Sequence, residues 1–265
     1  MKFFNLNLIL LLIILLYTCS LFDIKLENED AKYFGLLFGI SLYNDSTIND
    51  LKFADIDAID LGGILKENYD YVEIITNENA TKLEISNKII LLSKIIKNND
   101  IFLFLFSGHG SLVGSNYYII PSDAIYGDIT TYINNDDLSY WLNKIKSSKK
   151  ILLFDNCYSY INVSNSVIIT GGNSNELTWE YSTLNHGIFM YTIIKGITNK
   201  MADINKDNIV TVSELYYYIK PIIEKYTSNN TPNKSFVQHP YFIGDENIEI
   251  VFIDYKKTNG GYLWV

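Results

Sequence analysis

A histidine and a cysteine that could form a nucleophilic pair lie 48 residues apart in this 265-residue chain. His109 comes shortly after the apolar run Ile101–Phe106, and Cys157 comes shortly after the apolar run Ile151–Phe154. If both runs are strands of one parallel sheet, their carboxyl ends lie at the same edge, where ligands bind in such sheets. The spacing therefore predicts that an imidazole and a thiol meet there, as a cysteine hydrolase requires.

The residues around this pair suit nucleophilic catalysis. A thiol at its ordinary pKa is mostly protonated at neutral pH, so His109 would take its proton and later protonate the leaving amine. Glycines flank His109, and the N–H groups of Gly110 and Cys157 are candidate donors to an oxyanion. The alternative is a Gly turn beside a packed core thiol. Gly-His-Gly and Asp-x-Cys-x-Ser, both placed at strand ends, together favour the catalytic pair.

Apolar runs alternate with helical periods along the chain and predict the frame that positions the pair. Strands are expected at 33–40, 71–75, 101–106, 151–154, 166–170, 241–243 and 249–253. Helices are expected at 55–65, 83–96, 138–145, 187–197 and 213–226, the last interrupted at Pro221. Such alternation favours a mostly parallel sheet with helices on both faces.

These motifs resemble those of the caspase-like cysteine peptidases, and among them the metacaspases and their bacterial relatives. Further matching segments are the first strand at 35–40, the helix start at 54–58 and the segment 185–191. The resemblance, which covers about 33–253, implies a three-layer α/β/α sandwich of the α/β class with a mostly parallel central sheet of about six strands. It also implies a cysteine-type endopeptidase with His109 and Cys157 as the catalytic dyad.

The resemblance places the substrate pocket at Asp57, Ser107 and Asp155. All basic residues of the chain are lysines, so the arginine pocket with which caspases bind aspartate is absent. A carboxylate pair suits a cationic side chain, which predicts Lys or Arg at P1, the residue before the cleaved bond. The alternative for Asp57 is a solvent-facing helix residue, because Asp55 and Asp60 lie nearby in the sequence.

The N-terminus has the pattern of a secretory leader. One lysine precedes an apolar core at 8–16, and Cys19 lies near its end. Cleavage, lipidation at Cys19 and a retained anchor stay open, and each predicts export. The expected organisation is a signal peptide or lipoprotein leader at 1–20, a tether at 21–31, a peptidase domain at 32–256 and a tail at 257–265. Within the domain, 32–165 resembles the large subunit of caspases and 166–256 the small subunit.

Composition and net charge restrict the classes of partner that we expect. The 48% hydrophobic content is typical of a globular domain, and a net charge of −9 argues against nucleic acid as a partner. We expect a protein or peptide substrate, a membrane contact only through the leader or a lipid anchor, and a monomer, as in metacaspases. A catalytically silent binding module of the same fold is the alternative.

Two acidic sets are candidate calcium sites, although the chemistry itself requires no cofactor. Asp203, Asn205, Asp207 and Glu214 follow the spacing of an EF-hand loop, with Asn208 in place of the usual glycine. The resemblance suggests a second set, Asp123, Asp136 and Asp137. The alternatives are a capping loop for the first set and a plain helix N-terminus for the second.

Two further features complete the expectations. No lysine or arginine occurs from Ile151 to Ile194, so an enzyme that needs a basic P1 residue cannot cut itself between its halves. We therefore expect activity as a single chain. His186 and His239 are interpreted as packed or surface histidines without a catalytic role.

Overall fold

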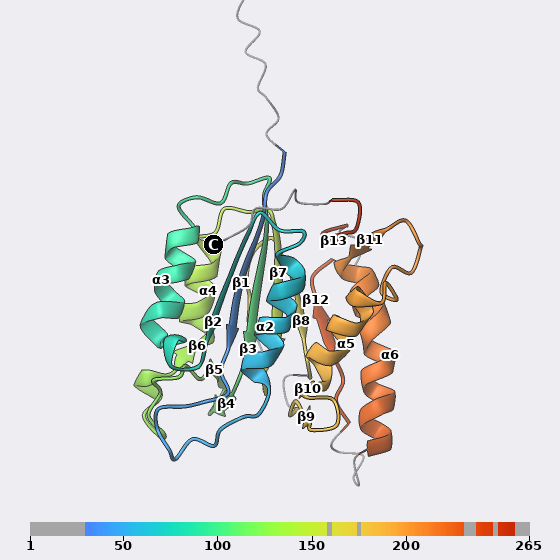
Figure 1. The fold of residues 1–265 in the computed structure, drawn as a ribbon. Coiled ribbons are helices and arrows are strands. Elements are labelled where there is room, and N and C mark those ends of the chain that lie inside the picture. Colours follow the sequence, from blue (N-terminus) through green and yellow to red (C-terminus); the bar gives the residue numbers. More distant parts are fainter. Residues whose placement is uncertain (1–29, 158–160, 174–175, 231–236, 246–248, 258–265) are drawn as a thin grey trace, which may run out of the picture. The chain divides into compact units, whose positions relative to one another are not determined.

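The computed structural model describes residues 30–157, 161–173, 176–230, 237–245 and 249–257. Contacts divide the chain into the units Met1–Asp30 and Ala31–Val265, and the second carries the fold (Figure 1). The leader at 1–20, nearly all of the tether and most of the tail lie outside the described residues. Within the described residues, no helix combines the length and apolarity needed to cross a membrane.

A six-stranded sheet forms the centre of the second unit. Its strands, in spatial order, are β12 (Tyr241–Ile243), β8 (Ser166–Thr170), β7 (Lys149–Asp155), β3 (Ile101–Ser107), β1 (Tyr33–Gly39) and β2 (Tyr71–Thr76). All neighbours pair in parallel except β12, which runs antiparallel to β8. The central strands are continuous apolar runs because both of their faces are covered, and every residue of β3 is buried.

Helices cover both faces of the sheet, which confirms the predicted three-layer α/β/α architecture (Figure 1). On one face lie α3 (Lys82–Leu92) and α4 (Asn135–Asn143), and on the other α2 (Ala54–Leu65), α5 (Ile188–Thr198) and α6 (Val212–Asn230). Each face has its own core: Phe102 and Phe104 of β3 pack toward α3 and α4, whereas Leu103 and Leu105 pack toward α2 and α5. This alternation follows from the two-residue period of a strand.

Short elements that the sequence analysis did not predict surround the sheet. They are the strands β4 (Gly110–Val113), β5 (Asn116–Ile119), β6 (Ile133–Asn134), β9 (Glu180–Tyr181), β10 (His186–Gly187) and β11 (Ile209–Thr211), and the 3₁₀ turns η1 (Asn77–Asn79) and η2 (Ile129–Thr131). The strands β4, β5 and β6 form one small sheet, and β9 and β10 form a hairpin. β13 (Val251–Asp254) pairs with β11 rather than with the central sheet.

Two helices differ most from the prediction, and α4 also begins three residues earlier than expected, at Asn135. α3 ends at Leu92 instead of residue 96, because the chain continues as turns closed by bonds such as Lys94 N–H to the Leu91 carbonyl. α6 is continuous through Pro221 and extends to Asn230. Proline removes one helical hydrogen bond, but Ile219 and Ile223 on either side of it are fully buried, and this packing holds the helix together.

The strand register brings the predicted site residues to one edge. Ser107 of β3 pairs with Asp155 of β7 on one side and with Gly39 of β1 on the other. Gly39 allows α2 to begin directly against β1, since a Cβ atom at this position would lie 2.3 Å from the Ala54 carbonyl oxygen. The start of α2 therefore lies beside the carboxyl ends of the central strands.

Candidate active site

His109 and Cys157 follow neighbouring strands at equivalent positions. Each lies two residues beyond the paired residues Ser107 and Asp155, at the carboxyl edge of the sheet. The Gly108 N–H donates to the Asp155 carbonyl at 3.2 Å and so continues the pairing past the strand ends. The two residues that the sequence analysis singled out therefore share one edge of the fold.

Gly110, the predicted oxyanion donor, lies against the backbone of the cysteine. A Cβ atom at Gly110 would be 2.0 Å from the Cys157 carbonyl oxygen and 2.4 Å from the Asn156 Nδ2, so only glycine fits. Gly110 stands opposite Ile119 in β5, and the adjacent bond runs from the N–H of Ile120, just after β5, to the His109 carbonyl. This pattern leaves the Gly110 N–H outside the β4–β5 ladder and available to a substrate.

The imidazole of His109 is oriented by two groups from the loop after β1. Its Nε2 lies 2.7 Å from the Asn49 carbonyl oxygen, and its backbone N–H donates to the Tyr43 hydroxyl at 2.8 Å. The Tyr43 ring lies 5.0 Å from the imidazole, centre to centre. Because a carbonyl can only accept, Nε2 carries the proton in this arrangement, and Nδ1 is left as the basic nitrogen.

The environment of Cys157 favours the protonated thiol at rest. Burial raises the pKa of Cys157, and the negative charge of Asp155 raises it further, whereas hydrogen bonds from Thr178 lower it. Cys157 is a free cysteine and is partly exposed. A protonated thiol needs a base to become a nucleophile, and His109 follows the strand next to that of Cys157.

Two buried carboxylates lie at the same edge. Asp57 of α2 is 1% exposed and Asp155 of β7 is 7% exposed, so Asp57 is not the solvent-facing helix residue that the sequence left open. A Cβ atom at Gly187 would lie 2.7 Å from Asp155 Oδ2 and 3.2 Å from Asp57 Oδ2. Only glycine at position 187 therefore lets both carboxylates come this close to the chain.

Both carboxylates have raised pKa values. Burial raises the pKa of Asp57 to about 6, against the hydrogen bond and charge of His186. Burial, followed by the charges of Asp57 and Glu180, raises the pKa of Asp155 well above its usual range, and a hydrogen bond from Thr178 opposes this. Adjacent buried carboxylates with raised pKa values are poised to bind a cation, which would restore their ionised forms.

The third predicted pocket residue, Ser107, ends β3 and is 2% exposed. Its carbonyl accepts the Ile40 N–H at 2.9 Å, which ties the end of β1 to the end of β3. Ser107 thus lies at the same edge as the two carboxylates, between β1 and β7.

The candidate calcium residues have other partners. Asp123 accepts the Lys82 N–H at 2.8 Å, and Asp137 accepts from the Asn134 side chain at 3.0 Å, at the start of α4 beside Asp136. Among the described residues, no three His, Cys, Asp or Glu side chains gather as a metal site requires.

The second calcium candidate is a loop closed by its own side chains. Asp203 accepts the N–H groups of Asp207 and Asn208, and Asp207 also bonds Asn205. Glu214 accepts from the Asn205 N–H at 3.2 Å, and Asn208 has a φ of 69°, the conformation expected where an EF-hand carries glycine. Calcium binding at either set stays a prediction.

Several residues of the site were missed by the sequence analysis. Asn49 acts through its backbone carbonyl, and the Tyr43 hydroxyl accepts the backbone N–H of His109, so neither contact follows a sequence motif. Thr178 contacts both Cys157 and Asp155. His186, interpreted as a packed or surface residue, bonds the buried Asp57 at 2.6 Å, a contact 129 residues long in sequence.

Comparisons with known proteins agree with this fold. The family model described as caspase domain matches residues 33–233. Protein GSU0716 from Geobacter sulfurreducens has a similar structure, with a TM-score of 0.61 and 16% identity over 80% of this chain and 92% of that one. No curated protein matches the chain in sequence.

Two caspase structures also share this fold. Caspase-1 from Spodoptera frugiperda has a TM-score of 0.63 and 15% identity, over 82% of this chain and 89% of that one. The structure of pro-sf-caspase-1 has a TM-score of 0.58 and 13% identity, over 82% and 92% of the two chains. At these identities the structural matches establish a shared fold.

Proposed function

The chain belongs to the caspase-domain family, and on that premise we propose that it is a cysteine endopeptidase of metacaspase type that cleaves after lysine or arginine. One observation carries the proposal: a cysteine and a histidine follow paired strands at the edge where two buried carboxylates both lie against Gly187. The first pair supplies the chemistry, and the second supplies a reason for a cationic P1 side chain.

The reaction begins with the protonated thiol. His109 Nδ1 takes the proton of Cys157 as the sulfur attacks the scissile carbonyl, while the imidazole stays oriented by the Asn49 carbonyl. The N–H groups of Gly110 and Cys157 stabilise the oxyanion. The imidazolium then gives its proton to the leaving amine, and a water molecule hydrolyses the acyl-enzyme with His109 again acting as base.

The substrate preference follows from charge. A P1 lysine or arginine is proposed to bind Asp155 and Asp57, the two carboxylates that lie against Gly187. A P1 aspartate would add a third carboxylate to two that already repel each other, in a pocket that no arginine can neutralise. Discrimination between these substrates is therefore expected to be large.

A peptide series that varies only at P1 tests this proposal. With lysine, arginine, norleucine and aspartate at P1, we expect kcat/KM to be highest for the two basic residues and lowest for aspartate. Cys157→Ala is the matched control and should cleave none of the peptides. Equal or faster turnover of the aspartate peptide by the wild type would refute the preference.

A second prediction concerns processing. Because no basic residue occurs between Ile151 and Ile194, the purified active enzyme is expected to be one uncut chain across its two halves. Intact-mass analysis of wild type and Cys157→Ala checks this. A cut between residues 158 and 180 that is present in the wild type and absent from the variant would contradict it.

The remaining expectations extend the proposal beyond the site. Export through the leader, with or without lipidation at Cys19, and a monomeric state are proposed on the sequence patterns given above. The leader lies outside the described residues. Calcium is proposed as a possible modulator and not as a participant in the chemistry.

A further inference from the structure

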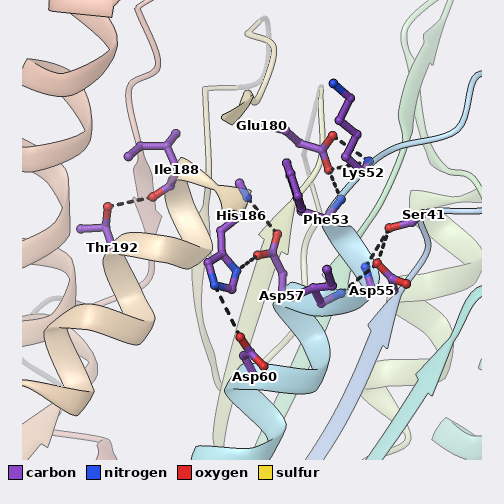
Figure 2. Close-up of polar contacts among 12 residues, drawn as sticks. Ser41, Lys52, Phe53, Asp55, Asp57, Asp60, Glu180, His186, Ile188 and Thr192 are labelled. Carbon is purple, nitrogen blue, oxygen red and sulfur yellow. Dashed lines mark hydrogen bonds and ion pairs between the residues drawn. The ribbon is translucent and has the colours of Figure 1, made fainter. Parts of the chain in front are cut away.

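His186 lies between two carboxylates of α2, as Figure 2 shows. Its Nδ1 is 2.6 Å from Asp57 Oδ1, and its Nε2 is 3.5 Å from Asp60 Oδ2. The Asp57 side chain is 1% exposed and that of Asp60 is 49% exposed, so the shorter contact is made to the buried carboxylate. His186 is itself largely buried, with 13% of its side chain exposed.

The two oxygens of Asp57 have different surroundings. Oδ1 is hydrogen-bonded to His186, whereas Oδ2 accepts the Gly187 N–H at 3.2 Å and lies, like Asp155 Oδ2, close against Gly187. Both contacts come from the strand β10, which packs against α2. β10 therefore sets the direction in which the second oxygen of Asp57 points.

The other charged groups around this carboxylate are mostly negative. Glu180 of β9 caps the start of α2 by accepting the N–H groups of Lys52 and Phe53, and its charge raises the pKa of Asp57. Asp155 faces Asp57 from β7, and Asp60 lies one turn along α2. The ring of Tyr191 on α5 lies 6.1 Å from the His186 ring.

Among these neighbours, His186 is the group whose charge opposes the protonation of Asp57. Burial and Glu180 both favour the neutral carboxyl, and the Gly187 N–H alone would counter them if His186 were absent. A buried carboxyl without a charged partner is expected to be neutral at pH 7. Part of the binding free energy of a cation would then be used to ionise Asp57, so the cation would bind more weakly.

We propose that His186 is a positioning residue of the P1 pocket, which holds Asp57 as an anion with Oδ2 directed toward Asp155 and the incoming cationic side chain. This rests on the proposed function, because it assumes that a P1 lysine or arginine binds there. His186 acts through Asp57 and has no role in the attack by Cys157. Its loss should therefore change substrate binding and leave the chemical step intact.

The test compares two substitutions that differ in one hydrogen bond. His186→Leu keeps an apolar volume of similar size but removes the donor to Asp57, and His186→Asn keeps an N–H near the position of Nδ1. With a P1-lysine peptide at pH 7, we expect His186→Leu to raise KM roughly tenfold with kcat unchanged, and His186→Asn to recover most of that loss. In the pH profile of kcat/KM, the acidic limb should move to higher pH in both variants, because neither carries the imidazole charge that keeps Asp57 ionised.

Controls separate this role from damage to the fold or to the chemistry. His239→Leu removes a histidine that is paired with Glu176 at 2.7 Å, and it should leave KM and the acidic limb unchanged. The rate at which iodoacetamide alkylates Cys157 should match the wild type in every variant. If His186→Leu does not fold, the pH profile of His186→Asn alone tests the proposal: an acidic limb at the wild-type pH would overturn it.

The outcomes are distinct. An unchanged KM and acidic limb in His186→Leu, in an enzyme that cleaves after lysine, would overturn the role of His186 and leave the proposed function standing. A wild type that cleaves no P1-lysine or P1-arginine peptide would refute the proposed function, and the role of His186 with it.

Discussion

Replacing His109 by glutamine is expected to lower kcat/KM for a P1-lysine peptide by about 10⁴-fold or more. Burial and the charge of Asp155 raise the pKa of Cys157, so little thiolate exists at neutral pH without a base. Glutamine retains a side-chain N–H that can still donate to the Asn49 carbonyl, but it cannot accept and return a proton. Steady-state kinetics on the purified variant gives the measurement.

The pH dependence of the variant tells loss of the base from loss of the fold. As the pH rises toward the raised pKa of Cys157, the thiolate forms unaided, so alkylation by iodoacetamide should increase with pH in His109→Gln. His239→Gln is the matched control and should retain full activity, because His239 pairs with Glu176 and is half exposed. Activity above one tenth of the wild type in His109→Gln would contradict its role as the general base.

Replacing Asp155 by asparagine is the second change with a large expected effect. Asparagine has the same shape but no charge, so kcat/KM for a P1-lysine peptide should fall roughly 100-fold, the cost of removing one partner of a buried charge pair. A P1-norleucine peptide, which lacks the cation, should be cleaved at least as well as by the wild type. An unchanged preference for lysine over norleucine would show that Asp155 does not bind the P1 side chain.

Asp155→Asn is expected to lower activity but not to lower the stability of the folded protein. The pKa of Asp155 is raised in the folded protein, so the folded state binds more protons than the unfolded state as the pH rises from the ordinary value of an aspartate to the raised one. Stability therefore falls over that window, and Asp155→Asn should abolish this loss. We expect a Tm at pH 7 that equals or exceeds that of the wild type. A marked fall in Tm would mean that Asp155 is a structural residue.

Asp155→Asn also reports on the thiol. The negative charge of Asp155 raises the pKa of Cys157, so its removal should lower that pKa. Faster alkylation of Cys157 at neutral pH, together with slower cleavage after lysine, would separate the reactivity of the nucleophile from substrate binding.

The central strands and the edge at which His109 and Cys157 lie could be predicted because buried parallel strands are continuous apolar runs. Ser107 and Asp155, which directly follow two of these runs, are paired in the sheet, although the sequence analysis predicted a common edge and no register. The small sheets were missed, since strands such as β9 and β10 are two residues long and carry no period. The interruption predicted at Pro221 was wrong. The flanking isoleucines are buried by tertiary packing, which the local sequence does not show.

The supporting residues of the site could not be predicted for a different reason. The Asn49 carbonyl and the Gly187 N–H are backbone groups, whose roles depend on position and not on residue type. The contact between Asp57 and His186 joins α2 to a hairpin 129 residues away. A histidine beside a glycine gives no hint of that partner, and only the packing of β10 against α2 reveals it.

The most direct test of a cysteine peptidase with a cationic P1 pocket is covalent labelling by a lysyl chloromethyl ketone, read by intact mass and peptide mapping. We expect one adduct, on Cys157. It should form in the wild type, form much more slowly in Asp155→Asn and be absent from Cys157→Ala. An aspartyl chloromethyl ketone should react far more slowly. A wild type that the lysyl reagent does not label would contradict the proposed peptidase and favour a catalytically silent module of the same fold. Equal reaction with the aspartyl reagent would contradict the cationic P1 pocket.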